Sequence, residues 1–151
     1  MSRKSPSMDT DDLGGSPETL TRKQVVEALR KGQPLAEADM RGTDLSGLSF
    51  DNADLRNAKL ADANLTNASF RGSNLSGASL WHANLKDAVL DQANLEEADL
   101  DFANLDGATL RGAKIKKAIF PLKRLSLDDL RDAVRSGKRL SMEGTPLEDD
   151  E

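Results

Sequence analysis

WHANLKDAVLDQANLEEADLDFANLDGATLRGAKIKKAIF, residues 81–120, is the later part of a stretch from Ala36 to Phe120 in which every fifth residue is large and apolar. The seventeen centres follow one another without a frame shift: Met40, Leu45, Phe50, Leu55, Leu60, Leu65, Phe70, Leu75, Leu80, Leu85, Leu90, Leu95, Leu100, Leu105, Leu110, Ile115 and Phe120. Two places before the centre the residue is Ala in fourteen blocks, the exceptions being Thr43, Leu48 and Ser73. One large and one small apolar residue per block predict that both point into a narrow interior.

A period of five fits neither a helical face nor a simple strand alternation, so no single regular element carries it. Short repeats indicate stacked units, here a short extended segment and a turn per block. The blocks resemble the pentapeptide-repeat family, whose consensus A(D/N)LXX they match over residues 36–120. The resemblance implies an all-β solenoid, a right-handed quadrilateral β-helix with four blocks per coil. Seventeen blocks would then give a little over four coils, with short α-helices capping the two ends.

Composition restricts the classes of function. The 151 residues are 37% hydrophobic and only 3% aromatic, they include no Cys, and the net charge is −5. Without Cys there are no disulfides and no thiolate metal sites. Without a long apolar run or a secretory leader, we expect a cytoplasmic protein that does not enter a membrane. The negative charge argues against nucleic acid as a direct ligand.

Changes in composition and periodicity divide the chain. We expect a disordered leader because the first residues are polar, rich in Ser, Asp, Gly and Pro, and have no periodicity. The predicted parts are the leader at 1–18, an N-terminal capping helix at 19–34, the repeat β-helix at 35–125, a C-terminal capping helix at 126–140 and an acidic tail at 141–151.

The first helix has clear boundary signals. Thr21 and Gln24 have the spacing of a capping box, and Gly32 is suited to end the helix. Its apolar stripe is predicted to cover the open first coil and consists of Val25, Val26 and Leu29.

The same signals recur 105 residues later. Leu125, Ser126, Asp129, Leu130 and Gly137 occupy the places of Leu20, Thr21, Gln24, Val25 and Gly32. We favour two caps that cover the strand edges at both ends of the stack. The alternative is that the second helix begins a further repeat block or docks a partner's coils.

With four blocks per coil, residues twenty apart stack on one another. Phe50 should therefore stack on Phe70 inside the coil. Outside, the column Asp51, Arg71, Asp91 and Arg111 alternates in charge. An acidic belt comprises Asp87, Asp91, Glu96, Glu97, Asp99, Asp101 and Asp106. A basic rim follows it and comprises Arg111, Lys114, Lys116, Lys117, Lys123 and Arg124. These belts are either solvated surface or a means of orienting end-to-end assembly.

Four large side chains are predicted to lie outside on one wall. His82 and Phe102 are twenty residues apart, Trp81 precedes His82, and Ile119 projects higher up. Grouped exposed apolar residues mark contact surfaces, and Trp is enriched in binding hot spots. We therefore predict a protein-contact patch of Trp81, His82, Phe102 and Ile119. The alternative is that the segment after Gly137 folds over these residues and makes them core.

Catalysis, a metal site and a cofactor are not expected. His82 is the only His, and the carboxylates lie on convex walls where nothing desolvates them. The leading hypothesis is a non-catalytic scaffold that binds an unidentified protein partner through an outer wall. End-to-end stacking or pairing through the aromatic patch would instead give a homo-oligomer. The family resemblance implies two alternatives: a DNA-mimicking modulator of a type II topoisomerase, and an accessory protein of a bacterial secretion system.

Overall fold

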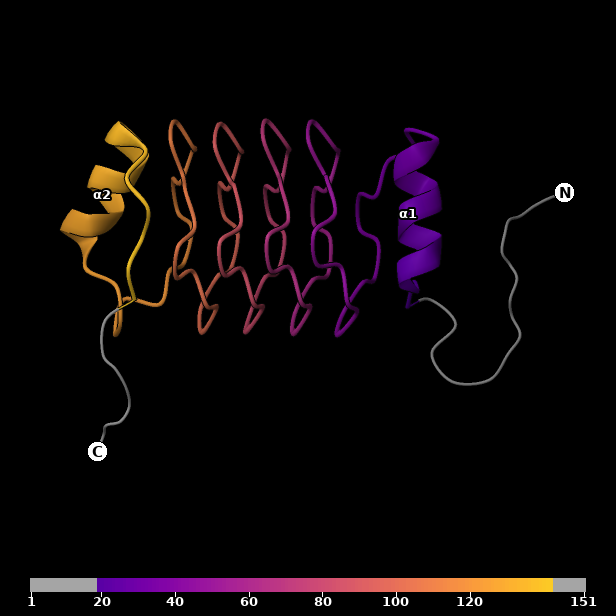
Figure 1. The fold of residues 1–151 in the computed structure, drawn as a ribbon, viewed down its shortest axis with the longest axis horizontal. Coiled ribbons are helices and arrows are strands. Elements are labelled where there is room, and N and C mark those ends of the chain that lie inside the picture. Colours follow the sequence, from indigo (N-terminus) through magenta and orange to yellow (C-terminus); the bar gives the residue numbers. More distant parts are fainter. Residues whose placement is uncertain (1–18, 143–151) are drawn as a thin grey trace, which may run out of the picture.

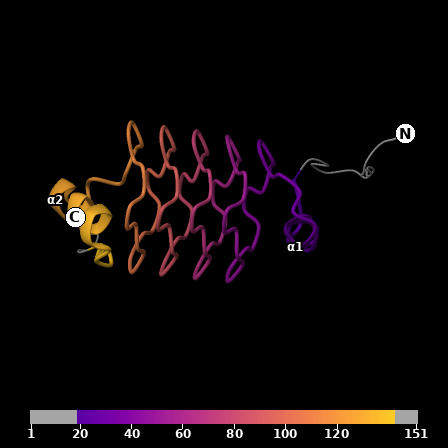
Figure 2. The same ribbon diagram turned by 90° about the horizontal axis from the view of Figure 1, so that it is seen from above.

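The computed structural model describes residues 19–142, and in this part of the chain the helices are α1 (Arg22–Arg30) and α2 (Leu127–Ser136). Between them the repeat blocks wind into a stack of coils, with α1 at one end and α2 at the other (Figure 1). The view from above shows the same order (Figure 2). The predicted disordered leader and the acidic tail beyond Met142 lie outside the described residues.

One coil takes twenty residues. Every β-bridge within residues 19–142 is parallel and joins residues twenty apart, from Thr19 with Asp39 to Asp99 with Ile119. Four blocks therefore make one coil, as the resemblance implied. We number the coils 1 to 4, and they span 36–55, 56–75, 76–95 and 96–115, with a further block at 116–120. Because the bridges are isolated, each wall is built from short extended segments rather than long strands.

Hydrogen bonds of the backbone repeat from block to block. The N–H of Leu80 donates to the carbonyl oxygen of Asp99 in the next coil at 2.7 Å, and the N–H of His82 donates to that of Asp101 at 2.9 Å. The N–H of Ala83 donates to the carbonyl oxygen of Leu80 at 3.0 Å and closes the turn between them. The backbone N–H and C=O groups of each block are thus bonded within the turn and to the neighbouring coil. The stack therefore does not depend on long β-strands for its backbone hydrogen bonds.

The second residue of each turn has a positive φ, for example 68° at Gly42 and 61° at Asn52. Gly and Asn tolerate this conformation best, which explains their frequency two places after the centre. The turns predicted from the sequence therefore lie at the four corners of each coil.

The core is a column of centres flanked by Ala. Every centre from Met40 to Leu110 is completely buried. The rings of Phe50 and Phe70 stack with their centroids 5.0 Å apart and an angle of 6° between planes, which confirms that prediction. Burying one such side chain stabilises the fold by about 2 kcal/mol.

At the N-terminal end, α1 begins at the predicted capping box. The side chain of Thr21 accepts the N–H of Gln24 at 3.1 Å, and the side chain of Gln24 accepts the N–H of Thr21 at 2.9 Å. Val25 is completely buried, whereas Val26 is 40% exposed. The predicted apolar stripe is therefore wrong at Val26: consecutive helical residues point about 100° apart, and here Val25 faces the coil while Val26 is turned toward solvent.

At the C-terminal end, Ser126 caps α2 by accepting the N–H of Asp129 at 3.0 Å, and Gly137 ends the helix with a φ of 83°. Leu130 and Ala133 are the buried residues of this helix. The Arg111 side chain donates from Nη2 to the carbonyl oxygen of Ser136 at 2.6 Å, which ties the end of α2 to coil 4.

The end of α2 and the segment after it run back along the edge of coil 4. The N–H of Gly112 donates to the carbonyl oxygen of Val134 at 2.8 Å, and that of Gly107 donates to Leu140 at 2.7 Å. The N–H of Leu105 points at the Met142 sulfur at 3.0 Å. As the chain advances from residue 134 to residue 142, its partners in coil 4 go backward from residue 112 to residue 105. The direction is opposite to that of the repeat, so residues 134–142 cover the end of the coils and do not add another coil. Of the helices within residues 19–142, neither is long and apolar enough to cross a membrane.

Candidate functional site

The predicted contact residues lie on one wall of the stack, which we call the Trp81 wall. In each coil it consists of one extended segment between two turns. Its rows are residues 36–42, 56–62, 76–82, 96–102 and 116–120, one above another.

An aromatic cluster of Trp81, His82 and Phe102 occupies one edge of the Trp81 wall. The ring centroids of Trp81 and Phe102 are 5.8 Å apart at an angle of 70°, and those of Trp81 and His82 are 5.3 Å apart. Trp81 is 42% exposed and Phe102 is 59% exposed. The structure therefore brings three of the four predicted residues together on the surface. His82 Nδ1 also lies 2.6 Å from Oδ1 of Asp62 in the coil below.

Phe102 occupies a backbone position that does not favour it. Its φ is 61°, and His82 below it has the same value. A bulky side chain in this region is an outlier, where Gly or Asn would be accepted at lower cost. Because Phe102 is also exposed, neither turn geometry nor core packing accounts for an aromatic ring here.

Ile119 lies on the same wall but in a different column. It forms a bridge with Asp99 and is 51% exposed, in the column that includes Ser79. Leu122 is 50% exposed as well, and the sequence reasoning missed it. Leu122 follows Phe102 by twenty residues, so the twenty-residue register could have placed it above Phe102, although the regular blocks end at Phe120.

Residues 138–142 do not cover the aromatic cluster. Hydrogen bonds join Leu140 and Met142 to residues 105–108, on a different side of coil 4. One alternative was that residues after Gly137 fold over the aromatic patch and make it part of the core. Residues 138–142 do not do so.

Carboxylates on the Trp81 wall have two different surroundings. In coil 1, Arg41 donates from Nε to Oδ1 of Asp39 at 2.9 Å and from Nη2 to Oδ2 at 2.7 Å. The Arg41 guanidinium holds the pKa of Asp39 below its ordinary value, against the opposing effect of burial. In coil 4 the same two places hold Asp99 and Asp101, and the described residues supply neither with an ion-pair partner within 4.0 Å.

The predicted acidic belt encircles coils 3 and 4 rather than forming one patch. Asp91 belongs to the alternating column: Arg71 Nη1 lies 3.4 Å from Asp91 Oδ2, and the N–H of Arg111 donates to Asp91 Oδ1 at 3.3 Å. Asp87 pairs with Lys86 at 3.5 Å. Asp106 accepts the N–H of Met142 at 3.1 Å and so helps to hold the last segment.

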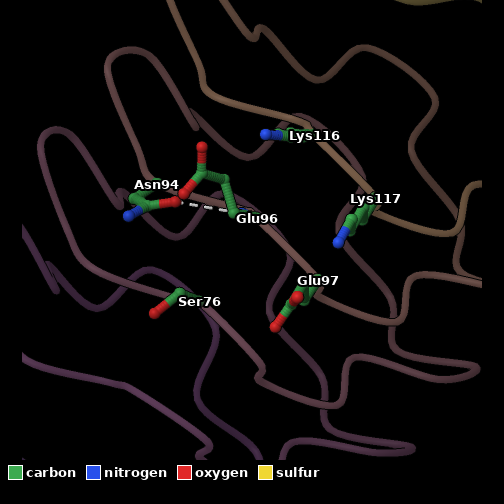
Figure 3. A pocket seen from close by; sticks show the side chains of 6 residues that line it. All are labelled: Ser76, Asn94, Glu96, Glu97, Lys116 and Lys117. Carbon is green, nitrogen blue, oxygen red and sulfur yellow. Dashed lines mark hydrogen bonds between the residues drawn. The ribbon is translucent and has the colours of Figure 1, made fainter.

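A polar hollow of about 360 Å³ lies at the other edge of the Trp81 wall. Six residues line it: Ser76, Asn94, Glu96, Glu97, Lys116 and Lys117. Figure 3 shows the two glutamates between the lysines and Ser76, and the dashed line marks the N–H of Glu96 donating to Asn94 Oδ1 at 3.0 Å. The acidic belt and the basic rim meet here, so the two signs of charge offset each other. Among residues 19–142 no three His, Cys, Asp or Glu side chains gather to hold a metal ion.

Comparison with known proteins gives several matches. The profile of a family described as Pentapeptide repeats matches residues 35–72, 73–112 and 83–120. Among solved structures, a pentapeptide repeat protein from Nostoc PCC 7120 is 32% identical, with 80% of this chain and 98% of that chain covered and a TM-score of 0.64. Rfr23, a pentapeptide repeat protein from the cyanobacterium Cyanothece 51142, is 34% identical, with 71% and 67% covered and a TM-score of 0.57.

A pentapeptide repeat protein from the thylakoid lumen of Arabidopsis thaliana is 37% identical, with 52% of this chain covered and a TM-score of 0.51. The chain spans only 54% of the length of that plant protein. No curated protein sequence matches the chain.

Proposed function

Because the chain belongs to the pentapeptide-repeat family, whose members fold as right-handed quadrilateral β-helices, we propose that it is a non-catalytic scaffold that binds a protein partner through the Trp81 wall. We place this scaffold in the cytoplasm. Proteins of the family are generally non-catalytic repeat proteins. A rigid stack held by hydrogen bonds at every corner suits a role in which the surface is presented rather than moved.

One observation carries the proposal: Trp81, His82 and Phe102 form an exposed cluster that the fold does not require. Exposed apolar groups gathered on a soluble surface mark contact sites. Trp supplies a large contact area and dominates the energetics of many interfaces. Phe102 strengthens the argument because its positive φ, 61°, would favour a smaller residue.

A DNA-mimicking modulator of a type II topoisomerase is the second candidate, and the surface charges disfavour it. A mimic of duplex DNA needs a continuous row of negative charge. The column Asp51, Arg71, Asp91, Arg111 alternates in sign, and Arg71 pairs with Asp91 at 3.4 Å. A role as an accessory protein of a secretion system has no supporting feature among the described residues.

A pull-down from the source organism's lysate tests the proposal. The wild type is compared with a Trp81→Ala/Phe102→Ala double variant, and bound proteins are identified by mass spectrometry. We expect one partner to be recovered with the wild type and to be lost with the double variant. Recovery of a topoisomerase by both forms would instead place the DNA-mimic function first.

Val26→Ala/Leu127→Ala provides the matched control. These two residues are 40% and 50% exposed and lie on the capping helices, outside the Trp81 wall. The control removes a similar class of exposed apolar surface, so its capture of the partner should equal that of the wild type. Loss of the partner in this control would show nonspecific apolar adhesion.

A further inference from the structure

Coil 1 shows how the Trp81 wall binds a guanidinium group. Asp39 precedes the centre Met40 and Arg41 follows it, and the two side chains form paired hydrogen bonds of 2.9 and 2.7 Å around the corner. Asp39 is only 7% exposed, so its carboxylate is held by its surroundings. Parallel N–H···O contacts of this kind are the geometry that Arg makes best.

Coil 4 has the same frame without the guanidinium. Asp99 and Asp101 flank the centre Leu100, sixty residues after their counterparts in coil 1. Asp99 Oδ1 accepts the N–H of Asp101 at 3.0 Å, and Asp101 Oδ1 accepts the N–H of Phe102 at 3.1 Å. Both carboxylates are thus oriented by the backbone, and neither belongs to any of the ion pairs with N···O within 4.0 Å among residues 19–142.

These two carboxylates border the aromatic cluster. Asp101 lies one coil above Trp81 and immediately before Phe102, and its carbonyl oxygen accepts the N–H of His82. Neighbouring coils are about 4.8 Å apart, so a cation on Asp101 is within reach of the Trp81 ring. Asp62, on the other side of the cluster, already contacts His82 at 2.6 Å. The exposed aromatic rings are therefore flanked by acids on both sides.

We propose that this edge of the Trp81 wall docks an arginine-bearing segment of the protein partner, with the guanidinium on Asp99 and Asp101 and an adjacent apolar side chain against Trp81 and Phe102. The inference rests on the proposed function and adds the chemistry of the partner. Arg is favoured over Lys because its planar fork fits a carboxylate with two hydrogen bonds and also stacks on aromatic faces. An acidic segment is excluded by repulsion from Asp62, Asp99 and Asp101.

Selection from a displayed library of random peptides tests the chemistry directly. Immobilised wild type is the bait, and enriched peptides are titrated against Asp101→Arg, Asp99→Asn and Trp81→Ala/Phe102→Ala. We expect enriched peptides to carry Arg beside a large apolar residue. Asp101→Arg should weaken their binding about tenfold or more, because it places an internal guanidinium on Asp99 as in coil 1 and repels the incoming one.

Asp128→Arg is the charge-matched control. Its side chain is 95% exposed on α2 and is not part of the Trp81 wall, so binding should equal that of the wild type. Equal weakening by Asp101→Arg and Asp128→Arg would overturn the inference, because it would show a response to net charge alone.

The remaining outcomes separate the inference from the proposed function. Peptides that require Trp81 but bind Asp101→Arg as tightly as the wild type would overturn the arginine site and leave the scaffold function standing. Enriched peptides that bind all variants equally would count against both. A concentration-dependent dimer in size-exclusion chromatography that Trp81→Ala abolishes would make a second copy the occupant and overturn the inference.

Discussion

Coils 1 and 4 share one backbone frame on the Trp81 wall and an Asp before the centre, but the two residues after the centre differ. Coil 1 carries Asp39, Arg41 and Gly42, whereas coil 4 carries Asp99, Asp101 and Phe102 at the same places. In coil 1 the charges pair at 2.7 Å and the corner is a glycine with a φ of 68°. In coil 4 the carboxylates lack a cation and the corner is an exposed aromatic residue.

The difference between the two coils shows that the inward residues determine stability, whereas the outward residues determine the chemistry of the surface. The repeat needs only the inward residues and a tolerable turn, so the outward residues can change without altering the coil. In coil 1 the charge of Asp39 is neutralised by Arg41. In coil 4 the carboxylates have no cation among the described residues and the ring of Phe102 is exposed. We interpret coil 1 as a part of the wall whose charged side chains pair with each other, and coil 4 as the part that contacts a partner.

The largest expected effect comes from breaking the frame that both coils share. Leu80 is completely buried between them. Leu80→Asp would bury an unpaired charge and leave a void, which should destabilise the fold by more than about 4 kcal/mol. Loss of the cooperative transition in urea unfolding, followed by circular dichroism, is the expected observation.

The adjacent residue provides the control for this substitution. Trp81 is 42% exposed, so Trp81→Ala should leave the melting temperature nearly unchanged. A drop comparable to that of Leu80→Asp would mean that Trp81 is part of the core, and the contact-wall proposal would then fail.

The next effect is a pH dependence of the stability that Asp39 contributes in coil 1. Arg41 lowers the pKa of Asp39 in the folded protein, so the stability that this carboxylate contributes is present above its unfolded pKa of about 3.9 and is lost as the pH falls through the lower folded value. Asp39→Asn should therefore cost about 1 kcal/mol at pH 7. This deficit should shrink as the pH falls below about 4.

Asp99→Asn tests the same wall position in coil 4. Asn keeps the Oδ1 acceptor that the N–H of Asp101 uses, and there is no guanidinium to lose. Its urea midpoint at pH 7 should match that of the wild type. If both variants lose equal stability, the distinction between a paired and an unpaired carboxylate is wrong.

A smaller effect is expected from exchanging the corner residues. An added Cβ at Gly42 would meet no atom within 4 Å, but the φ of 68° would strain any larger residue. Gly42→Phe should thus cost about 1 kcal/mol. Phe102→Gly relieves that strain but loses the contact with Trp81, so its net effect should be below about 0.5 kcal/mol. Denaturant titration of the two variants measures both, and a large loss in Phe102→Gly would contradict the strain argument.

The smallest effect is expected from a substitution that gives coil 4 the Asp–Arg pair of coil 1. Asp101→Arg places a guanidinium beside Asp99, and this exposed pair should raise stability by about 0.5 kcal/mol. A crystal structure of the variant should show the two side chains paired as Arg41 and Asp39 are. A guanidinium directed into solvent would show that the two corners are not equivalent.

Much of the fold could be predicted from the sequence because a strict period leaves few alternatives. The stacking of Phe50 on Phe70, the turn positions and the capping box at Thr21 are all confirmed. The stripe on α1 was wrong at Val26 because the helix turns Val25 toward the coil, which leaves Val26, about 100° away, toward solvent. The path of residues 138–142 was not predictable, since the repeat pattern has ended there.

The aromatic cluster could be predicted in part. The twenty-residue register places His82 under Phe102, and the structure places the Trp81 ring against both, 5.3 Å from His82 and 5.8 Å from Phe102. Leu122 was missed, and Ile119 lies in another column of the wall. The acidic belt remains a prediction about coils 3 and 4, and the sequence did not indicate which of its carboxylates have a cation.

By itself, the five-residue period determined the inward residues and the corners, because an interior with room for one large and one small residue per side admits only one inward set of side chains. Four blocks per coil came from the resemblance to the pentapeptide-repeat family, and the bridges between residues twenty apart show them. Tertiary structure alone decided that Asp39 pairs with Arg41 and that Asp99 has no such partner. The reason is physical: pairing depends on the distance and direction of side chains around a corner and between coils, and a period of inward residues carries no information about either.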